Sequence, residues 1–426
     1  MNIEKSKLYI EKRSLSEIMV FMIFVTPLIS QSLIEFLKMP SMITLIADAV
    51  LVVFVGIILL KKAFMLDRRL AVFSFVIILF LVYTLIGYIF NFQSPFYYLW
   101  GTRNYFRFYV AFFTFALVLN KNKAESYLGI LDKLFWINAI VAAVQILMGY
   151  RQDHLGGIFG IQKGCNGHTL VFIIIVVAKS LLQFMNGKEK TILCLLKSSV
   201  ALIISAFAEL KIFFFIFVAL VIFATILTSF SLRKVSFLLV SAMLVFVTST
   251  ILTLVFDNFK GFLSIESVIM QLTLENYASN KDIGRFTAFS SLSERFLTTT
   301  PSQLFGMGLG NCDTSSISLF NSDFYKSYSS THYTYFSHSF LFIETGVIGF
   351  VIYTSFFIIS LVKSIKSLKY NDNKLFSQLA VITSVVCFIL LVYNSSLRTD
   401  IAYLIYFVLA LPFVDVEEKL HVELQR

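Results

Sequence analysis

The chain has 426 residues, of which 58% are hydrophobic and 14% are charged, with a formal net charge of +10. Soluble globular proteins carry about 25% charged residues, so this composition excludes an ordinary soluble domain. The basic residues gather in every second connecting segment and form no single basic face, which argues against nucleic-acid binding. Solid apolar blocks without strand-like alternation also exclude a membrane β-barrel. The sequence therefore predicts an all-α polytopic membrane protein.

Apolar runs of about 18 to 22 residues recur along the whole chain, long enough to cross a ~30 Å hydrocarbon core as helices. Twelve spans are expected near residues 18–37, 42–60, 70–90, 104–119, 131–149, 168–186, 191–208, 212–230, 235–256, 336–361, 376–394 and 399–413. The first run lacks a small-residue cleavage site, so it is interpreted as a retained span and not as a signal peptide.

The placement of basic residues predicts the orientation of these spans. Alternate connecting segments carry Lys5, Lys7, Lys12, Arg13, Lys61, Lys62, Arg68, Arg69, Lys121, Lys123, Lys133, Lys188, Lys190, Arg233, Lys234, Lys363, Lys366, Lys369 and Lys374. Lys and Arg are retained on the cytoplasmic side, so both termini are expected in the cytoplasm. The chain then divides into residues 1–256 with nine spans, a large extracytoplasmic loop at 257–335, and residues 336–426 with three spans and a short tail.

The large loop is polar, but Phe, Leu, Ile and Tyr recur in it, so we expect it to be ordered. Its stretch D-I-G-R-F-T-A-F-S-S-L-S-E-R-F-L predicts an amphipathic helix that Asp282 caps and that lies along the outer membrane surface or against the bundle. The glycine-rich segment L-F-G-M-G-L-G-N that follows predicts tight turns.

The cysteines and carboxylates argue against a metal or redox centre. No C-x-x-C spacing is present, and no D-x-D motif or dense carboxylate cluster lies in the outward loops. No metal or cofactor is therefore expected. Cys165 and Cys312 both lie in expected outward loops, where a disulfide is chemically allowed, but the sequence leaves that bridge open.

Two arginines at the outer start of the fourth expected span are candidate ligands for a diphosphate. Arg103 and Arg107 are four residues apart and share one helical face, and Arg107 is deep enough that we expect it to face the bundle interior. Two guanidinium groups on one face bind phosphate oxygens through paired hydrogen bonds. Snorkelling of the side chains to the membrane interface is the alternative.

Further basic residues lie in the other outward segments. Arg151 and Lys163 flank the glycine-rich segment L-G-G-I-F-G-I-Q-K-G-C-N-G, whose backbone suits phosphate binding, although an ordinary loop explains it equally well. Lys211 occupies a tight outward hairpin, where a simple ion pair with Glu209 is the alternative.

The stretch S-H-S-F-L-F-I-E-T-G-V-I-G-F marks the point where the large loop ends and an apolar helix begins. We expect Ser337 or Ser339 to cap this helix, so that the positive helix end keeps the His338 ring neutral and able to accept a proton. Glu344 lies six residues further on and on a different face. Arg285 is expected near the positive end of the loop helix. For His338 and Arg285 alike, a plain interfacial position is the alternative.

These features resemble the O-antigen polymerase and O-antigen ligase superfamily of bacterial envelope glycan enzymes. The similar features are the twelve-span plan with one late outward loop, Gly284–Arg285 followed by the glycine-rich segment Gly306 to Asn311, and the His338 motif. The motif is similar to the family pattern H-N-x-x-L-x-x-x-x-x-G-x-x-G. Ser339 stands where many relatives have Asn, which leaves any role of that amide open.

The resemblance implies a metal-independent, inverting, GT-C-like glycosyl transfer from an undecaprenyl diphosphate-linked glycan at the outer face of the bacterial cytoplasmic membrane. His338 would activate the acceptor hydroxyl as a base, and Arg285 would stabilise the leaving diphosphate. The implied residues that bind the diphosphate or the glycan are Arg103, Arg107, Arg151, Lys163, Lys211 and Glu344.

The acceptor distinguishes the possible activities. A polysaccharide polymerase, for O-antigen or capsule, uses a lipid-linked repeat unit as acceptor, and a ligase uses the lipid A core. Polymerases of the superfamily that this chain resembles are often very rich in Phe, Ile and Tyr. The resemblance therefore favours the polymerase over the ligase. The expected partners are the undecaprenyl diphosphate-linked oligosaccharide as donor and acceptor, membrane lipids and a chain-length regulator protein. A secondary transporter or a lipid-linked oligosaccharide flippase is the alternative from another class, although it would be expected to show repeated halves.

Overall fold

The computed structural model describes residues 2–61, 68–228, 232–255, 282–315, 317–370 and 374–414. Over these residues it contains fifteen α-helices joined by turns and short 3-10 helices, and no β-strand. The all-helical prediction is confirmed for this part of the chain. Before the large loop come α1 (Asn2–Phe36), α2 (Ile46–Lys61), α4 (Arg68–Phe90), α5 (Pro95–Val118), α6 (Lys121–Leu147), α7 (Asn166–Met185), α8 (Thr191–Phe207), α9 (Lys211–Ile226) and α10 (Leu232–Val255).

The loop and the last part of the chain supply the other six helices. They are α12 (Ala288–Arg295), α13 (Thr300–Phe305), α14 (Asp323–Tyr328), α15 (Ser337–Ser367), α16 (Lys374–Tyr393) and α17 (Ala402–Ala410). Residues 257–281 of the expected loop and the expected tail beyond 414 lie outside the described residues.

Every expected span overlaps one of these helices. Within the part of the chain that the structure describes, six helical segments are long and apolar enough to cross a membrane: Ser16–Phe36, Arg69–Phe90, Lys121–Leu147, Asn166–Met185, Ser337–Ser367 and Lys374–Tyr393. The chain is therefore a multi-pass membrane protein. Several shorter apolar helical segments, among them α8, α9 and the segment Ala402–Phe413 that contains α17, have 10–17 residues, so the count of twelve crossings stays a prediction.

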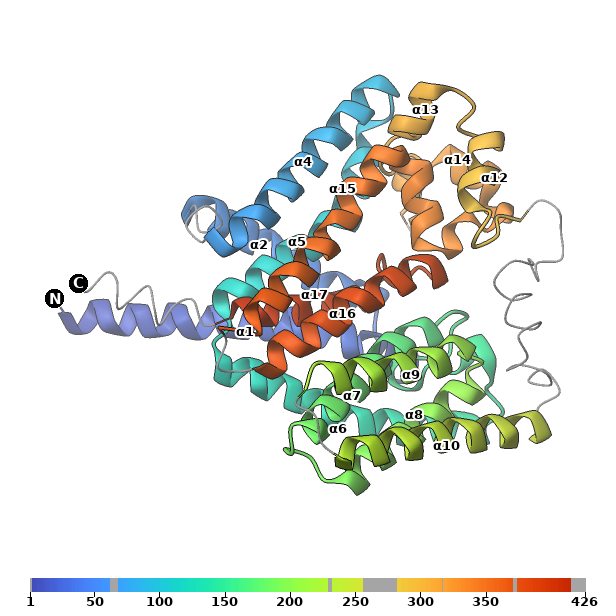
Figure 1. The fold of residues 1–426 in the computed structure, drawn as a ribbon. Coiled ribbons are helices and arrows are strands. Elements are labelled where there is room, and N and C mark those ends of the chain that lie inside the picture. Colours follow the sequence, from blue (N-terminus) through green and yellow to red (C-terminus); the bar gives the residue numbers. More distant parts are fainter. Residues whose placement is uncertain are drawn as a thin grey trace.

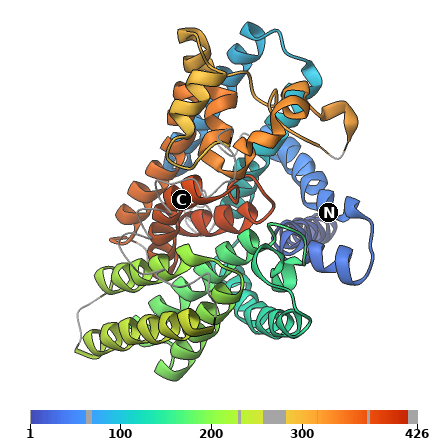
Figure 2. The ribbon, with the colours of Figure 1, turned by 90° about the vertical axis from the view of Figure 1, so that its right-hand side faces the viewer.

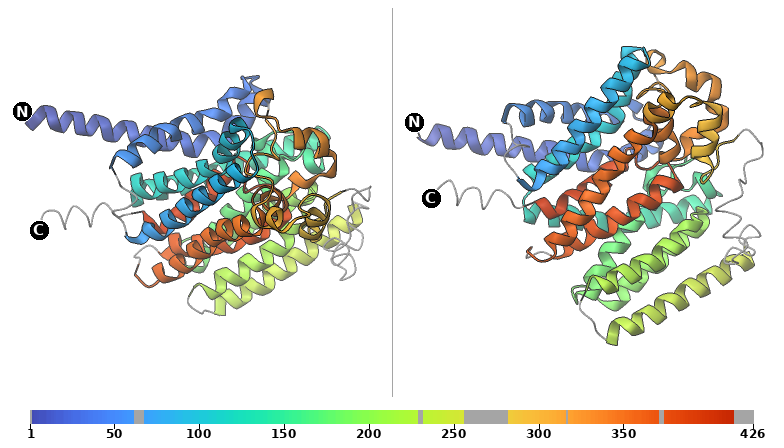
Figure 3. Two further views of the ribbon diagram at one scale, coloured as in Figure 1. Left: turned by 90° about the horizontal axis from the view of Figure 1, so that it is seen from above. Right: turned by 45° about the horizontal axis from the view of Figure 1, so that its top comes forward.

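The helices form an elongated bundle with the loop helices at one end (Figure 1). α16 lies between α15 and α7 and packs against both, and α17 packs against α5 and α16. Seen from the end in Figure 2, the green helices α7 to α10 lie on the opposite side of the bundle from α12 and α13. Both views of Figure 3 place the first turns of α1 far from α12, α13 and α14, so the start of the chain and the large loop lie at opposite ends.

Aromatic rings fill the centre of the bundle, as the 48 Phe and 19 Tyr of the sequence require. Tyr109 on α5 lies 5.0 Å from Phe356 on α15 and 5.7 Å from Tyr406 on α17, measured between ring centroids. All nine residues of α17 are buried. A helix that is apolar on every face belongs inside a bundle, which explains why α17 is enclosed by its neighbours.

The expected amphipathic helix of the loop is present but shorter than predicted. It spans only Ala288–Arg295, and its N-cap residue, Thr287, makes no capping hydrogen bond through its side chain. Leu292 is fully buried, whereas Phe286 is 58% exposed. The predicted cap is wrong, because the Asp282 carboxylate contacts the His332 ring instead.

All four cysteines are buried free thiols. The bridge between Cys165 and Cys312 that the sequence left open is therefore absent. Among the described residues, no group of three or more His, Cys, Asp or Glu side chains is arranged to hold a metal ion.

Candidate functional site

The structure brings His338 and Arg285 together at the start of α15. The His338 Nε2 atom lies 2.7 Å from the Arg285 carbonyl oxygen, and its Nδ1 atom lies 3.1 Å from the Leu391 carbonyl oxygen. The Arg285 guanidinium lies 5.0 Å from the ring centroids of both Phe336 and Tyr393. Two residues separated by 53 positions thus meet where the polar loop joins an apolar helix.

Both ring nitrogens of His338 face carbonyl oxygens, which only accept hydrogen bonds. A neutral ring donates to one carbonyl and directs the lone pair of its other nitrogen at the second. The ring is also 95% buried, with a relative exposure of 5%. In this arrangement His338 ties the Arg285 segment to the end of α16, and a substrate hydroxyl reaches Nε2 only by displacing the Arg285 carbonyl.

The predicted serine caps of α15 are wrong. The N-cap residue is Phe336, and no side chain caps the helix. The Ser337 hydroxyl donates to the Asn394 carbonyl at 2.8 Å, and the Ser339 hydroxyl donates to the Tyr333 carbonyl at 2.5 Å. Both hydroxyls therefore act as donors that hold the surrounding turns, because those carbonyls need partners once they are buried.

α15 is broken at Gly346, whose φ of 64° and ψ of −167° are not helical. The break leaves backbone carbonyls of the preceding turn without helical partners, and N–H groups of the glycine-rich segment donate hydrogen bonds to them. The Met307 N–H donates to the Ile343 carbonyl at 2.8 Å, and the Gly308 N–H donates to the Glu344 carbonyl at 3.0 Å. The two motifs singled out in the sequence are therefore one structural unit.

Glu344 is fully buried inside this unit. Its Oε1 atom accepts hydrogen bonds from the Gly310 N–H at 2.9 Å and the Cys312 N–H at 3.3 Å. Its Oε2 atom has no hydrogen-bond partner among the described residues. The carboxylate thus holds the glycine-rich segment against α15. Glu344 was predicted to bind substrate, and in the structure its hydrogen bonds go to this segment.

Arg103 and Arg107 lie on one face of α5 and pair with acidic residues of α2 and of the turn before α17. Arg107 is buried, as predicted, and its guanidinium lies 2.8 Å from Asp400 and 3.5 Å from Asp48. Arg103 also pairs with Asp48 and lies 4.7 Å from the centroid of the Trp100 ring. Both arginines are already neutralised by carboxylates in this structure.

A second ion pair continues this network toward α15. Arg398 lies 3.1 Å from Asp313, and the Asn104 side chain donates to Asp313 at 2.6 Å. The Arg398 guanidinium also lies over the ring of Phe340, two residues after His338. Sequence reasoning missed Asp48, in the first turn of α2, and Asp313, in the loop between α13 and α14, because a single carboxylate carries no motif.

The remaining candidates lie in other loops. Arg151 donates to the Ile146 and Tyr150 carbonyls at 2.7 and 2.8 Å, which places it at the end of its own helix, α6. Lys163 is exposed in the glycine-rich loop. Lys211 begins α9, and the nearby Glu209 accepts from the Gln152 side chain at 2.8 Å. These contacts link Arg151 and Glu209 to residues other than His338 and Arg285.

A third polar cluster lies between α6, α7 and α8. Asp132 pairs with Lys179 and with Lys197, and Lys197 lies 3.2 Å from Glu189. Each lysine side chain is at most 4% exposed. Sequence reasoning missed this cluster. The signal was the presence of Lys179 and Lys197 inside apolar runs, because a buried charge must be paired.

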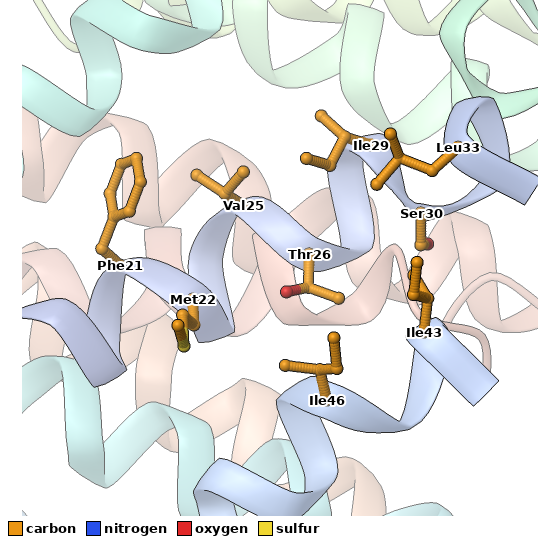
Figure 4. Close-up of a pocket in the computed structure, with 9 residues that line it drawn as sticks. All are labelled: Phe21, Met22, Val25, Thr26, Ile29, Ser30, Leu33, Ile43 and Ile46. Carbon is orange, nitrogen blue, oxygen red and sulfur yellow. The ribbon is translucent and has the colours of Figure 1, made fainter. Parts of the chain in front are cut away.

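The structure also contains a cavity of about 240 Å³ between α1 and the segment that leads into α2 (Figure 4). It is lined by Phe21, Met22, Val25, Thr26, Ile29, Ser30, Leu33, Ile43 and Ile46. These side chains are apolar apart from two hydroxyls, so the cavity offers no group for acid–base chemistry.

No family model, no curated protein and no solved structure matches the chain. The candidate site therefore rests on its own geometry and on the resemblance of its motifs.

Proposed function

We propose that the chain is a membrane glycosyltransferase of the O-antigen polymerase type. It transfers a glycan from undecaprenyl diphosphate onto a lipid-linked repeat unit at the outer face of the bacterial cytoplasmic membrane, without a metal and with inversion. The observation that carries the proposal is the contact between His338 and Arg285 at the junction of the polar loop with α15. The positive-inside distribution of lysine and arginine supports cytoplasmic termini and an outward loop.

Arg285 is the residue best suited to bind the donor diphosphate. Its Nε atom donates to the Tyr393 carbonyl at 3.3 Å, and no carboxylate among the described residues pairs with it. Arg103, Arg107 and Arg398 each pair with an aspartate. An unpaired guanidinium stabilises the charge that develops on a leaving diphosphate, and this gain is largest in the transition state.

Genetic complementation with gel analysis of the surface glycan tests this function. In a source strain that lacks the gene, loss of long chains with a single repeat unit still attached to the core indicates a polymerase. Loss of all attached glycan indicates a ligase, and an unchanged glycan pattern would refute both.

Substitution of the candidate residue tests the site. Arg285→Ala should abolish polymer formation while the protein still inserts in the membrane at the level of the wild type. Arg295→Ala is the matched control, because Arg295 is an exposed arginine on the same loop. Normal polymer from Arg285→Ala would remove the assigned role of that guanidinium.

A further inference from the structure

The C-terminal end of α16 offers backbone carbonyls as hydrogen-bond acceptors to segments from elsewhere in the chain. The last carbonyls of a helix have no partner within that helix. The Tyr393 carbonyl accepts from Arg285 Nε at 3.3 Å. The Asn394 carbonyl accepts from the Ser337 N–H at 3.0 Å and from the Ser337 hydroxyl at 2.8 Å. The end of α16 therefore holds both the start of α15 and the Arg285 side chain.

His338 joins the same helix end to the backbone of Arg285. Its Nδ1 atom lies 3.1 Å from the Leu391 carbonyl oxygen, and its Nε2 atom lies 2.7 Å from the Arg285 carbonyl oxygen. The shorter contact assigns the ring proton to Nε2, which then donates to Arg285. The rings of Phe289 and Phe336 lie 5.6 and 6.0 Å from the imidazole, measured between centroids. The imidazole is thus packed against two aromatic rings as well as two carbonyls.

Arg285 is consequently fixed both in its backbone and in its side chain. His338 holds its carbonyl, the Tyr393 carbonyl holds its Nε atom, and the rings of Phe336 and Tyr393 each lie 5.0 Å from its guanidinium. The C-terminal end of a helix carries a partial negative charge that favours a cation there. These contacts use Nε and leave Nη1 and Nη2 as the fork that binds phosphate oxygens.

We infer that His338 is a positioning residue, whose Nε2–H fixes the Arg285 backbone on the end of α16 so that the guanidinium meets the donor diphosphate. This inference rests on the proposed glycosyl transfer, and it differs from the role of base that the resemblance implies. A base must direct a nitrogen lone pair at the acceptor hydroxyl. Each nitrogen of His338 instead contacts a carbonyl of the chain itself, so His338 acts on the reaction through Arg285.

The expected effect of losing the Nε2 contact follows from this role. Without it, the backbone of Arg285 is no longer tied to α15, and the guanidinium moves relative to the diphosphate. A misplacement of about 1 Å in a group that stabilises a transition state lowers the rate on the order of 100-fold. The loss should appear in kcat, because the charge that Arg285 stabilises develops in the transition state.

Two amide substitutions separate positioning from proton transfer. The amide nitrogen of glutamine reaches the place of His338 Nε2, whereas that of asparagine reaches only the place of Nδ1. Neither amide accepts a proton at neutral pH. In purified full-length protein supplied with the lipid-linked repeat unit extracted from the deletion strain, His338→Gln should keep kcat within about fivefold of the wild type. His338→Asn, which loses the contact with the Arg285 carbonyl, should lower kcat on the order of 100-fold.

A merely structural role would not separate these two variants. Each amide keeps one of the two carbonyl contacts, so both proteins should unfold at the same denaturant fraction. His338→Leu is a second variant without the Nε2 donor and should also be slowed on the order of 100-fold. His154→Leu is the matched control, because His154 contacts the Ile161 carbonyl at 2.9 Å in another loop. It should leave the rate unchanged.

The outcomes distinguish this inference from the proposed function. If the wild-type protein forms no polymer from the extracted repeat unit, the proposed function fails. If the wild type forms polymer and His338→Gln is as slow as His338→Leu, the function stands and the positioning role is refuted. The role is equally refuted if His338→Asn keeps the rate of the wild type, because the rate then does not depend on the contact with Arg285.

Discussion

Substitution of Gly346 by alanine should destabilise the unit formed by α15 and the glycine-rich segment. The backbone at this position has φ of 64° and ψ of −167°, a region open essentially to glycine, and forcing a side chain into it costs about 1–3 kcal/mol. A Cβ atom there would lie 2.1 Å from the Leu304 carbonyl oxygen and 2.6 Å from that of Gln303. Relief of this clash needs a shift of roughly 1 Å in the end of α13.

Such a shift would weaken the hydrogen bonds that Met307 and Gly308 donate into the break of α15. Each is worth about 0.5–1.5 kcal/mol, so with the backbone term the expected loss in the free energy of unfolding is about 2–6 kcal/mol. The assay is reversible unfolding of the purified protein in mixed micelles, followed by circular dichroism.

Gly129→Ala on α6 is the matched control, because a Cβ atom there meets nothing within 4 Å. Alanine at a regular helical position is expected to change stability by at most about 1 kcal/mol, in the stabilising direction. If Gly346→Ala unfolds at the same denaturant fraction as Gly129→Ala, the backbone and clash argument is refuted.

Three further perturbations test the buried groups. Glu344→Gln keeps an acceptor for the two loop N–H groups and should fold, whereas Glu344→Leu should lose about 2–4 kcal/mol; equal stability of the two would contradict the anchoring role. Lys197→Met removes the cation that pairs with Glu189 and one of the two that pair with Asp132, and it should cost about 3–5 kcal/mol. A loss below about 1 kcal/mol by the same unfolding assay would be a contradiction. Burial raises the pKa of Cys165 to about 12 and that of Cys312 well above its usual range. Below those values the thiols stay protonated, so maleimide should label neither at pH 8 before unfolding, and labelling of the native protein would show that the sites are open.

The positions of the helices follow from the sequence because each apolar run must form a helix to satisfy its own backbone in the membrane. The expected span at 376–394 became α16, Lys374–Tyr393, and the expected span at 104–119 lies within α5 except for its last residue. Boundaries in the loop were less predictable. The helix expected from Asp282 onward begins only at Ala288, because Asp282 has a partner 50 residues away that no local pattern announces.

The site was accessible from the sequence only in part. Arg107 was expected to face the interior because a charge at that depth must be buried and paired, and this was confirmed. Its partners, Asp48 on α2 and Asp400 in the turn before α17, come from opposite ends of the chain, so no spacing could identify them. The approach of Arg285 to His338 was suggested by the resemblance and not by any pattern within the residues themselves.

The sequence alone determined that this chain is a bundle of membrane helices, because composition and the length of apolar runs act locally along the chain. The tertiary structure decided which polar groups meet. It paired His332 with Asp282, turned both nitrogens of His338 toward backbone carbonyls, and placed Glu344 under the glycine-rich segment. These contacts join residues far apart in sequence, and their energies depend on distance and burial, which exist only once the helices have packed.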